Sequence, residues 1–165
     1  MRCQRLIFSA MCMALYIVLM AVTQSFAFGP YQIRIATAVY GFCALYPFLM
    51  VPLSLANVIS NCLLGGLGIL DMVGGFCAGM MTTGAIVLGK KYGLGNWIIW
   101  AAVTLAPGLM VPMWLCVIFD VPYWILAGSL LVGQCVCGVV SMIWVSALER
   151  VGVRKFLAFE GGNKE

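Results

Sequence analysis

The chain contains no histidine and few charged residues of either sign. Charged residues make up 8% of its 165 residues, whereas a soluble domain carries about 25%. The absence of histidine excludes imidazole metal ligands and imidazole bases. The five acidic residues are scattered singly, so they do not suggest a trio of nucleophile, base and acid. We therefore expect neither an enzyme nor a metal or other cofactor.

The sequence also lacks a complete nucleotide-binding motif. Residues 84–91 read Gly-Ala-Ile-Val-Leu-Gly-Lys-Lys, close to the phosphate-binding pattern G-x-x-x-x-G-K-[S/T]. The final position is lysine, so the hydroxyl that would hold magnesium is missing, and the stretch ends an apolar segment rather than a strand. The eight cysteines lie almost entirely in apolar segments, which indicates small buried side chains rather than a disulfide or zinc framework.

Apolar residues are abundant instead, at 64% of the chain with a mean hydropathy of +1.10. Such a composition is typical of an integral membrane protein, in which a helix needs about 20 apolar residues to cross the bilayer. Residues 1–27 could also pass for a signal peptide, but their apolar run is too long for a usual signal core. We predict one all-α domain over residues 1–165 with six transmembrane helices. The expected helices cover residues 6–27, 35–50, 52–68, 72–89, 96–119 and 122–148.

The basic residues lie at the breaks between these apolar segments, which is how membrane orientation is encoded. If the N-terminus is cytoplasmic, six spans place eight of the nine basic residues inside and leave Arg34 alone outside. We therefore predict that both termini are cytoplasmic. The net charge of +4 then reflects orientation in the lipid bilayer, and no nucleic-acid partner is expected.

The same orientation gathers polar residues near the outer ends of the predicted helices. Ionisable groups near a bilayer are costly and indicate a functional site by default. Alternatives remain: Arg34 and Asp71 could be hydrated loop charges or an ion pair, and Asp71 could cap the helix over 72–89. Gln134, in the middle of the last helix, could bond a neighbouring helix or a ligand. The predicted substrate-binding residues are Tyr31, Gln32, Arg34, Thr37, Asn61, Asp71 and Gln134.

Two pairs of small residues, spaced four apart, mark faces where helices can approach closely in lipid. Ala10 and Ala14 form one pair in the first predicted helix, and Gly75 and Gly79 form another in the fourth. Either face could serve internal packing. For Ala10 and Ala14 the sharper hypothesis is docking on a helix of a partner protein.

Three segments of the chain form a recognisable set: Gln32-Ile33-Arg34-Ile35, the run Ala56-Asn-Val-Ile-Ser-Asn61, and Gly68-Ile-Leu-Asp71 followed by Val73-Gly74-Gly75. Together they resemble the QueT family. The resemblance implies a bundle like that of the substrate-binding S components of energy-coupling factor (ECF) importers, located in the bacterial plasma membrane. It also implies uptake of queuosine precursors, with a transmembrane coupling protein and two ATPase subunits as partners. The pair Ala10 and Ala14 looks like the one with which S components dock on the coupling protein.

The chain departs from the family pattern at one informative place. The family usually has Ser-Glu after the Gln-x-Arg-Ile segment, whereas this chain has Ala36-Thr37. A glutamate would suit a ligand that carries an ammonium group, and threonine offers only a hydroxyl. Queuine, the aminomethyl or nitrile deazaguanine precursors, and an unrelated nutrient therefore all remain open as the ligand. An S component for another vitamin and a helical membrane protein without a transport role remain alternatives.

Overall fold

The computed structural model describes residues 2–27, 33–65 and 67–152, and within them every element of regular structure is a helix, with no strand. The first predicted helix is observed as α1 with a short extension, α2, and the last three lie within about three residues of the predicted bounds. The bounds are α1 Arg2–Val22, α2 Gln24–Ala27, η1 Ile35–Ala44, η2 Pro47–Leu49, α3 Met50–Ser60, η3 Asn61–Gly65, α4 Ile69–Lys91, α5 Trp97–Phe119 and α6 Tyr123–Val151.

Five helical stretches of the described chain are long and apolar enough to cross a membrane: Cys3–Val22, Pro47–Gly65, Ile69–Lys91, Trp97–Phe119 and Tyr123–Val151. The prediction of a helix over 35–50 was wrong in its extent. That region forms the 3₁₀-helix η1, followed by a turn and by η2, which leads directly into α3. Ten residues of 3₁₀-helix reach about 20 Å, short of the roughly 30 Å hydrocarbon core. The sixth apolar segment is therefore a short central helix.

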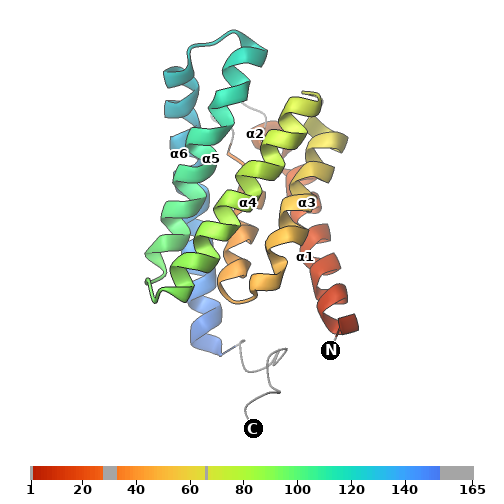
Figure 1. The fold of residues 1–165 in the computed structure, drawn as a ribbon, viewed down its shortest axis with the longest axis vertical. Coiled ribbons are helices and arrows are strands. Elements are labelled where there is room, and N and C mark those ends of the chain that lie inside the picture. The colour runs from red at the N-terminus through yellow and green to blue at the C-terminus, as the bar shows by residue number, and fades with distance from the viewer. Residues whose placement is uncertain (1, 28–32, 66, 153–165) are drawn as a thin grey trace.

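The successive segments nevertheless run in alternating directions along the bundle (Figure 1). Helix α1 rises from the lower end of the view, η1 descends, α3 rises, α4 descends, α5 rises and α6 descends. Consequently α1 begins and α6 ends at the same end of the bundle. The last turn of α4, which carries Lys90 and Lys91, also lies at this end, and Asp71 in the first turn of α4 lies at the opposite end. We refer to these as the basic end and the Asp71 end.

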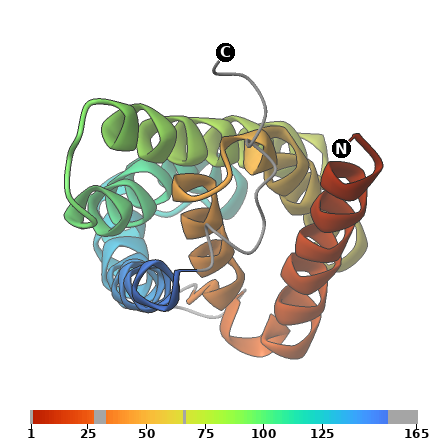
Figure 2. The same ribbon diagram turned by 90° about the horizontal axis from the view of Figure 1, so that it is seen from below.

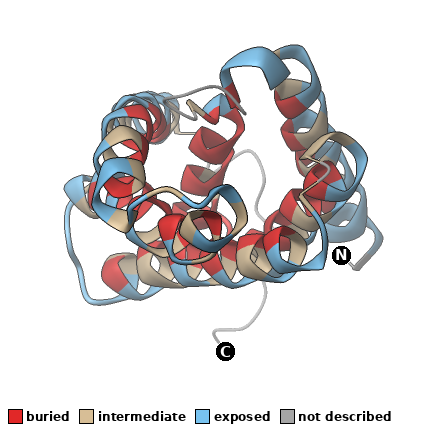
Figure 3. Ribbon diagram, turned by 90° about the horizontal axis from the view of Figure 1, so that it is seen from above, coloured by how far each residue is buried: buried red, intermediate tan, exposed pale blue. Residues whose placement is uncertain are grey.

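The short helix η1 lies at the centre of the bundle, with the longer helices around it (Figure 2). It contacts α1, α3, α4, α5 and α6, and eight of its ten residues are buried. Figure 3 shows the buried residues on the inward faces of the surrounding helices. Small residues allow this central position: a side chain at Gly41 would collide with Ser141 and would come within 2.9 Å of Val145 on α6. Ser141 Oγ also donates a hydrogen bond to the Ala38 carbonyl, at 2.9 Å.

Helices α3 and α4 are joined by a ladder of asparagine side chains. Asn57 Nδ2 donates to the Gly75 carbonyl at 2.8 Å, and Asn61 Nδ2 donates to the Asp71 carbonyl at 3.3 Å. The two asparagines are one turn apart on α3 and η3, and their acceptors are one turn apart in the opposite direction on α4, as antiparallel packing requires. A Cβ at Gly79 would lie 3.3 Å from Ser54 Cα. The small-residue face at Gly75 and Gly79 therefore serves internal packing.

Candidate functional site

Arg34 precedes η1 and is buried inside the bundle, with 4% of its surface exposed. Its Nη1 donates a hydrogen bond to Asn61 Oδ1 at 3.3 Å. A guanidinium cannot lose its charge in a protein, so the bundle holds a permanent cation in its interior. The alternative that Arg34 is a hydrated loop charge does not fit this burial. A buried cation in an apolar bundle is costly and indicates a functional site.

Asp71 lies in the first turn of α4 and is 1% exposed. Trp114 Nε1, on α5, donates to its Oδ1 at 3.1 Å. Its second carboxylate oxygen, Oδ2, is buried and has no hydrogen-bond partner among the residues that the structure describes. Gly68 occupies the cap position of α4, and α4 has no side-chain cap, so the alternative that Asp71 caps this helix is wrong.

Asn61 connects the two charged residues through its side-chain amide. Its Oδ1 accepts from Arg34 and its Nδ2 donates to the backbone carbonyl of Asp71. It is 2% exposed and begins η3, a π-helical turn that continues α3. Such π-helical turns occur often at functional sites because they re-aim the side chains of one turn. Both ends of the amide are engaged, so Asn61 holds Arg34 against α4.

Thr37 and Gln134 form a second buried contact, between η1 and the middle of α6. Thr37 Oγ1 lies 3.0 Å from Gln134 Oε1 and 2.7 Å from the Arg34 carbonyl, so its single hydrogen is shared between two acceptors. Thr37 is 3% exposed and Gln134 is 1% exposed. Gln134 therefore does bond a neighbouring segment, which was one of its two expected roles.

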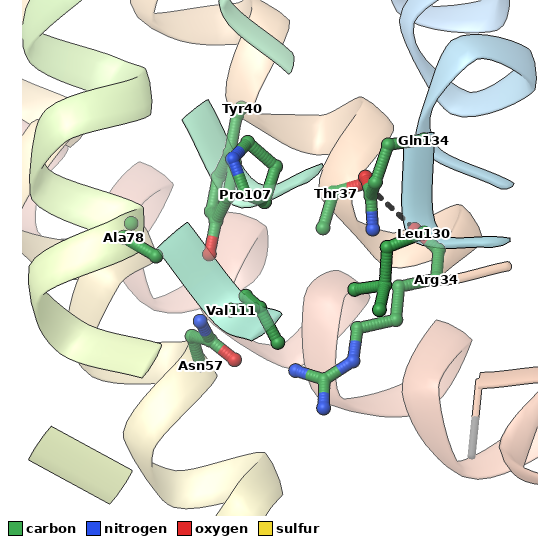
Figure 4. Close-up of a pocket in the computed structure, with 10 residues that line it drawn as sticks. Arg34, Thr37, Tyr40, Asn57, Ala78, Pro107, Val111, Leu130 and Gln134 are labelled. Carbon is green, nitrogen blue, oxygen red and sulfur yellow. Dashed lines mark hydrogen bonds between the residues drawn. The ribbon is translucent and has the colours of Figure 1, made fainter. Parts of the chain in front are cut away.

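A small cavity of about 10 Å³ lies between these residues. This volume is about what one water molecule requires, so the pocket is closed in this conformation. Figure 4 shows Arg34 and Asn57 toward one side of the cavity and Thr37 and Gln134 toward another. Side chains from η1, α3, α4, α5 and α6 converge on it. The lining residues are Arg34, Thr37, Tyr40, Asn57, Ala78, Gly79, Pro107, Val111, Leu130 and Gln134.

The predicted site residues fall into three groups. Arg34, Thr37 and Gln134 line the cavity. Asn61 is linked to it by its bond to Arg34, and Asp71 is linked to Asn61 through its backbone carbonyl. Tyr31 and Gln32 lie outside the described residues. The role of all seven in binding stays a prediction.

The predicted site omits three residues of this region: Asn57, Trp114 and Tyr40. From the sequence, Trp114 looks like an ordinary aromatic residue at the membrane interface. Nothing in its neighbourhood along the chain indicated the bond to Asp71. Asn57 carries a detectable signal, because it lies four residues before Asn61 and therefore shares its helix face. Tyr40 also lines the cavity, and its ring stacks on Tyr16 with centroids 5.5 Å apart.

Ala10 and Ala14 are both exposed on α1, on the surface that faces away from the bundle. Buried residues of the same helix, among them Tyr16 and Met20, pack into the interior instead. The small-residue face of α1 is therefore not used for packing within the described chain. It remains available for a partner helix or for lipid.

The arrangement suits binding rather than chemistry. Among the described residues no group of histidine, cysteine, aspartate or glutamate could hold a metal ion. The polar groups at the cavity offer a cation, an amide oxygen, a hydroxyl and a second amide. Backbone carbonyls accept from the Thr37 hydroxyl and the Asn57 amide, whereas Arg34 and Gln134 are held by side chains. Such a set can bind a small molecule that carries both hydrogen-bond donors and acceptors.

A bundle of apolar helices with a closed polar pocket in its interior is typical of membrane proteins that bind or carry small molecules. The chain belongs to the QueT transporter family, whose profile matches residues 6–150 and thus most of its length. It is accordingly a multi-pass membrane protein with a transport role, and not an enzyme. No curated protein and no solved structure matches the chain.

Proposed function

We propose that the chain is the substrate-binding component of an ECF-type importer and captures a 7-deazaguanine, either queuine or a queuosine precursor. The observation that carries the proposal is the buried cluster of Arg34, Asn61 and Asp71 beside a polar cavity. Membership of the QueT transporter family supports a transport role for this cluster. Opposite charges buried in an apolar bundle are retained where they serve a ligand.

The cluster matches the hydrogen-bonding groups of a deazaguanine. Such a base offers donors along its N1–H and 2-amino edge, and its ring carbonyl is an acceptor. Asp71 Oδ2 and Asn57 Oδ1 are buried acceptors with no partner in the described part of the chain, and Arg34 is a donor. Hydrogen bonds to charged groups are the strong ones, which suits a nutrient captured at low concentration. Tyr40 offers an aromatic face at the cavity, and Tyr31 is a further stacking residue in the proposal.

The positive-inside rule favours a cytoplasmic basic end, with Lys90, Lys91 and both termini inside. The Asp71 end then faces outward, in agreement with capture of a nutrient from the medium. The sequence has no complete nucleotide-binding motif, so energy for uptake would come from partners. In this proposal those partners are a transmembrane coupling protein and two ATPase subunits, and Ala10 and Ala14 form the docking face.

Ligand binding requires the bundle to open, because a bicyclic base does not fit a cavity of about 10 Å³. Pro107 lies in the wall of this cavity, inside α5. A proline in a helix interior removes one backbone hydrogen bond and weakens the helix at that turn. We propose that α5 moves at Pro107 when the ligand is bound.

Isothermal titration of the purified chain in detergent tests the proposal. The panel contains queuine, the aminomethyl and nitrile deazaguanines, guanine and thiamin. Tight binding of one deazaguanine, with a dissociation constant of roughly 1 nM or about 12 kcal/mol, is the expected result. Binding of thiamin alone would support the proposed transport component but contradict a deazaguanine as its substrate. If a well-folded protein binds no compound of the panel, that result would contradict the proposed substrate class.

A further inference from the structure

Asn57 lines the cavity with a hydrogen-bond acceptor that no described residue occupies. Its Nδ2 donates to the Gly75 carbonyl at 2.8 Å, and a carbonyl can only accept, so the backbone of α4 fixes which way the amide faces. The amide oxygen, Oδ1, is buried and has no hydrogen-bond partner among the described residues. Asn57 is 5% exposed and lines the cavity. A buried acceptor without a partner is costly, and native proteins keep few of them.

We infer that Asn57 determines ligand specificity, because its Oδ1 accepts a hydrogen bond from an exocyclic amino group of the ligand. This inference rests on the proposed function and adds to it a residue that recognises the amino group of the ligand. Within the described chain, Asp71 Oδ2 is the other buried acceptor without a partner, but Asp71 does not line the cavity and Asn57 does. Asn57 is therefore the acceptor that a ligand reaches in the pocket itself.

The surroundings of Asn57 define the class of ligand further. Arg34 lines the same cavity, and Figure 4 shows its guanidinium and the Asn57 amide toward the same side. A cation that donates and an amide oxygen that accepts select a heterocycle with a ring carbonyl at one position and an amino group at another. An analogue without the amino group would leave Oδ1 buried and unpaired, and a site built for a hydrogen bond rejects such analogues strongly.

A pair of probes isolates this contact. 7-Deazaguanine and 7-deazahypoxanthine differ only in the 2-amino group. We expect the wild-type chain to bind 7-deazaguanine at least about 10-fold more tightly by isothermal titration. In Asn57→Leu, which has similar volume but no acceptor, the preference should fall below about 3-fold. A general disturbance of the pocket would weaken both probes alike, so only the ratio of affinities reports on Oδ1.

Asn61→Leu is the matched control, since it removes the neighbouring hydrogen bond between an asparagine side chain and the backbone of α4. It should lower the affinity for both probes and keep the preference of about 10-fold for 7-deazaguanine. If Asn57→Leu does not fold, Asn57→Ser removes the amide oxygen with a smaller change in polarity. A preference that persists in the Asn57 variant, or a wild type that binds both probes equally, overturns the role of Asn57 alone. A wild type that binds no deazaguanine overturns the proposed function, and this inference with it.

Discussion

Each end of the molecule holds a cluster of polar side chains. The two clusters differ in how many of their donors and acceptors have hydrogen-bond partners. At the basic end, Lys90, Asn96, Ser146 and Glu149 form one network that ties the turn between α4 and α5 to α6. At the other end, Arg34, Asn61, Asp71 and Trp114 are linked in the interior. Only the second cluster adjoins buried acceptors that have no partner in the described chain.

The basic-end network is partly exposed and locally complete. Lys90 Nζ lies 3.1 Å from Glu149 Oε1, with 22% and 34% of the two side chains exposed. The Asn96 amide donates to both Ser146 and Glu149, at 2.8 Å and 2.7 Å. Every one of these groups is able to reach water or headgroups when its partner moves. Exposed ion pairs contribute little free energy, so this network joins the helix ends with only a small gain in stability.

The cluster near the Asp71 end carries a larger energetic burden. Arg34 and Asp71 are 4% and 1% exposed, and a buried charge needs full hydrogen bonding to offset its loss of water. Asp71 Oδ2 and Asn57 Oδ1 do not receive it from the described chain. The basic-end cluster is complete within the described chain, whereas the buried cluster is not. In the proposed function, a bound ligand supplies the missing hydrogen bonds.

The largest expected effect comes from removing the buried carboxylate. Asp71→Ala should weaken binding of the preferred deazaguanine at least about 100-fold, because a charged acceptor in a buried site is lost. Isothermal titration measures the loss, and circular dichroism with thermal unfolding checks that the variant is folded. Unchanged affinity in a folded Asp71→Ala protein would contradict a ligand site at this cluster.

Loss of the indole donor to Asp71 should lower stability. Trp114→Phe keeps an aromatic ring against Gly74 but removes the Nε1–H that donates to Asp71 Oδ1. The free energy of unfolding should fall by about 1.5–3 kcal/mol, as expected for a hydrogen bond to a charged group. Trp124→Phe is the control, since Trp124 is 80% exposed, and its effect should stay within about 0.5 kcal/mol. Equal effects of the two substitutions would show that the Trp114 bond does not stabilise the cluster.

A break in the basic-end network should have a much smaller effect. Lys90→Met removes an ion pair and a hydrogen bond to Asn96 while the apolar stem remains. We expect the free energy of unfolding to fall by no more than about 1 kcal/mol, with unchanged affinity for the ligand. Thermal unfolding and titration of the same preparation measure both quantities. A loss of ligand affinity comparable to that of Asp71→Ala would erase the distinction between the two clusters.

The smallest effect on binding is expected at the exposed face of α1. Ala14→Trp adds a large side chain to a surface that faces away from the bundle, so ligand affinity should stay within about 2-fold of wild type. Uptake by cells that also express the coupling subunits should nevertheless be lost, because the helix can no longer approach a partner closely. Val132→Trp, on an exposed position of α6, should spare both. Loss of binding together with uptake would instead assign Ala14 to internal packing.

Apolar length alone predicted most of the helices, because a stretch of about 20 apolar residues has few alternatives to a membrane helix. It did not predict η1, since hydropathy cannot distinguish a 3₁₀-helix from an α-helix over residues 35–44. The 3₁₀ form stretches a ten-residue segment further along the bundle and places Gly41 against α6. That choice depends on the packing of five helices around the segment and not on its own residues.

The proximity of Arg34, Asn61 and Asp71 was foreseeable. Successive helices alternate in direction, so the helix ends that carry these residues lie at the same end of the bundle. The bond between Trp114 and Asp71 was not, because it depends on the rotation of α5 against α4. The pairing of Asn57 with Gly75 was not foreseeable either. The asparagine pair and the glycine pair are each visible in the sequence, but the sequence does not show how α3 and α4 align along each other. Helix register is a property of the packed bundle rather than of any single segment.

The most direct test is an experimental structure of the chain with its preferred deazaguanine bound. We expect ligand density in contact with Arg34, Asn57 and Asp71, in a cavity widened well beyond about 10 Å³. We also expect that the basic-end contact between Lys90 and Glu149 stays as it is in the closed pocket. Ligand density anywhere else on the molecule, with the polar cavity still closed, would contradict the assignment of the buried cluster as the binding site.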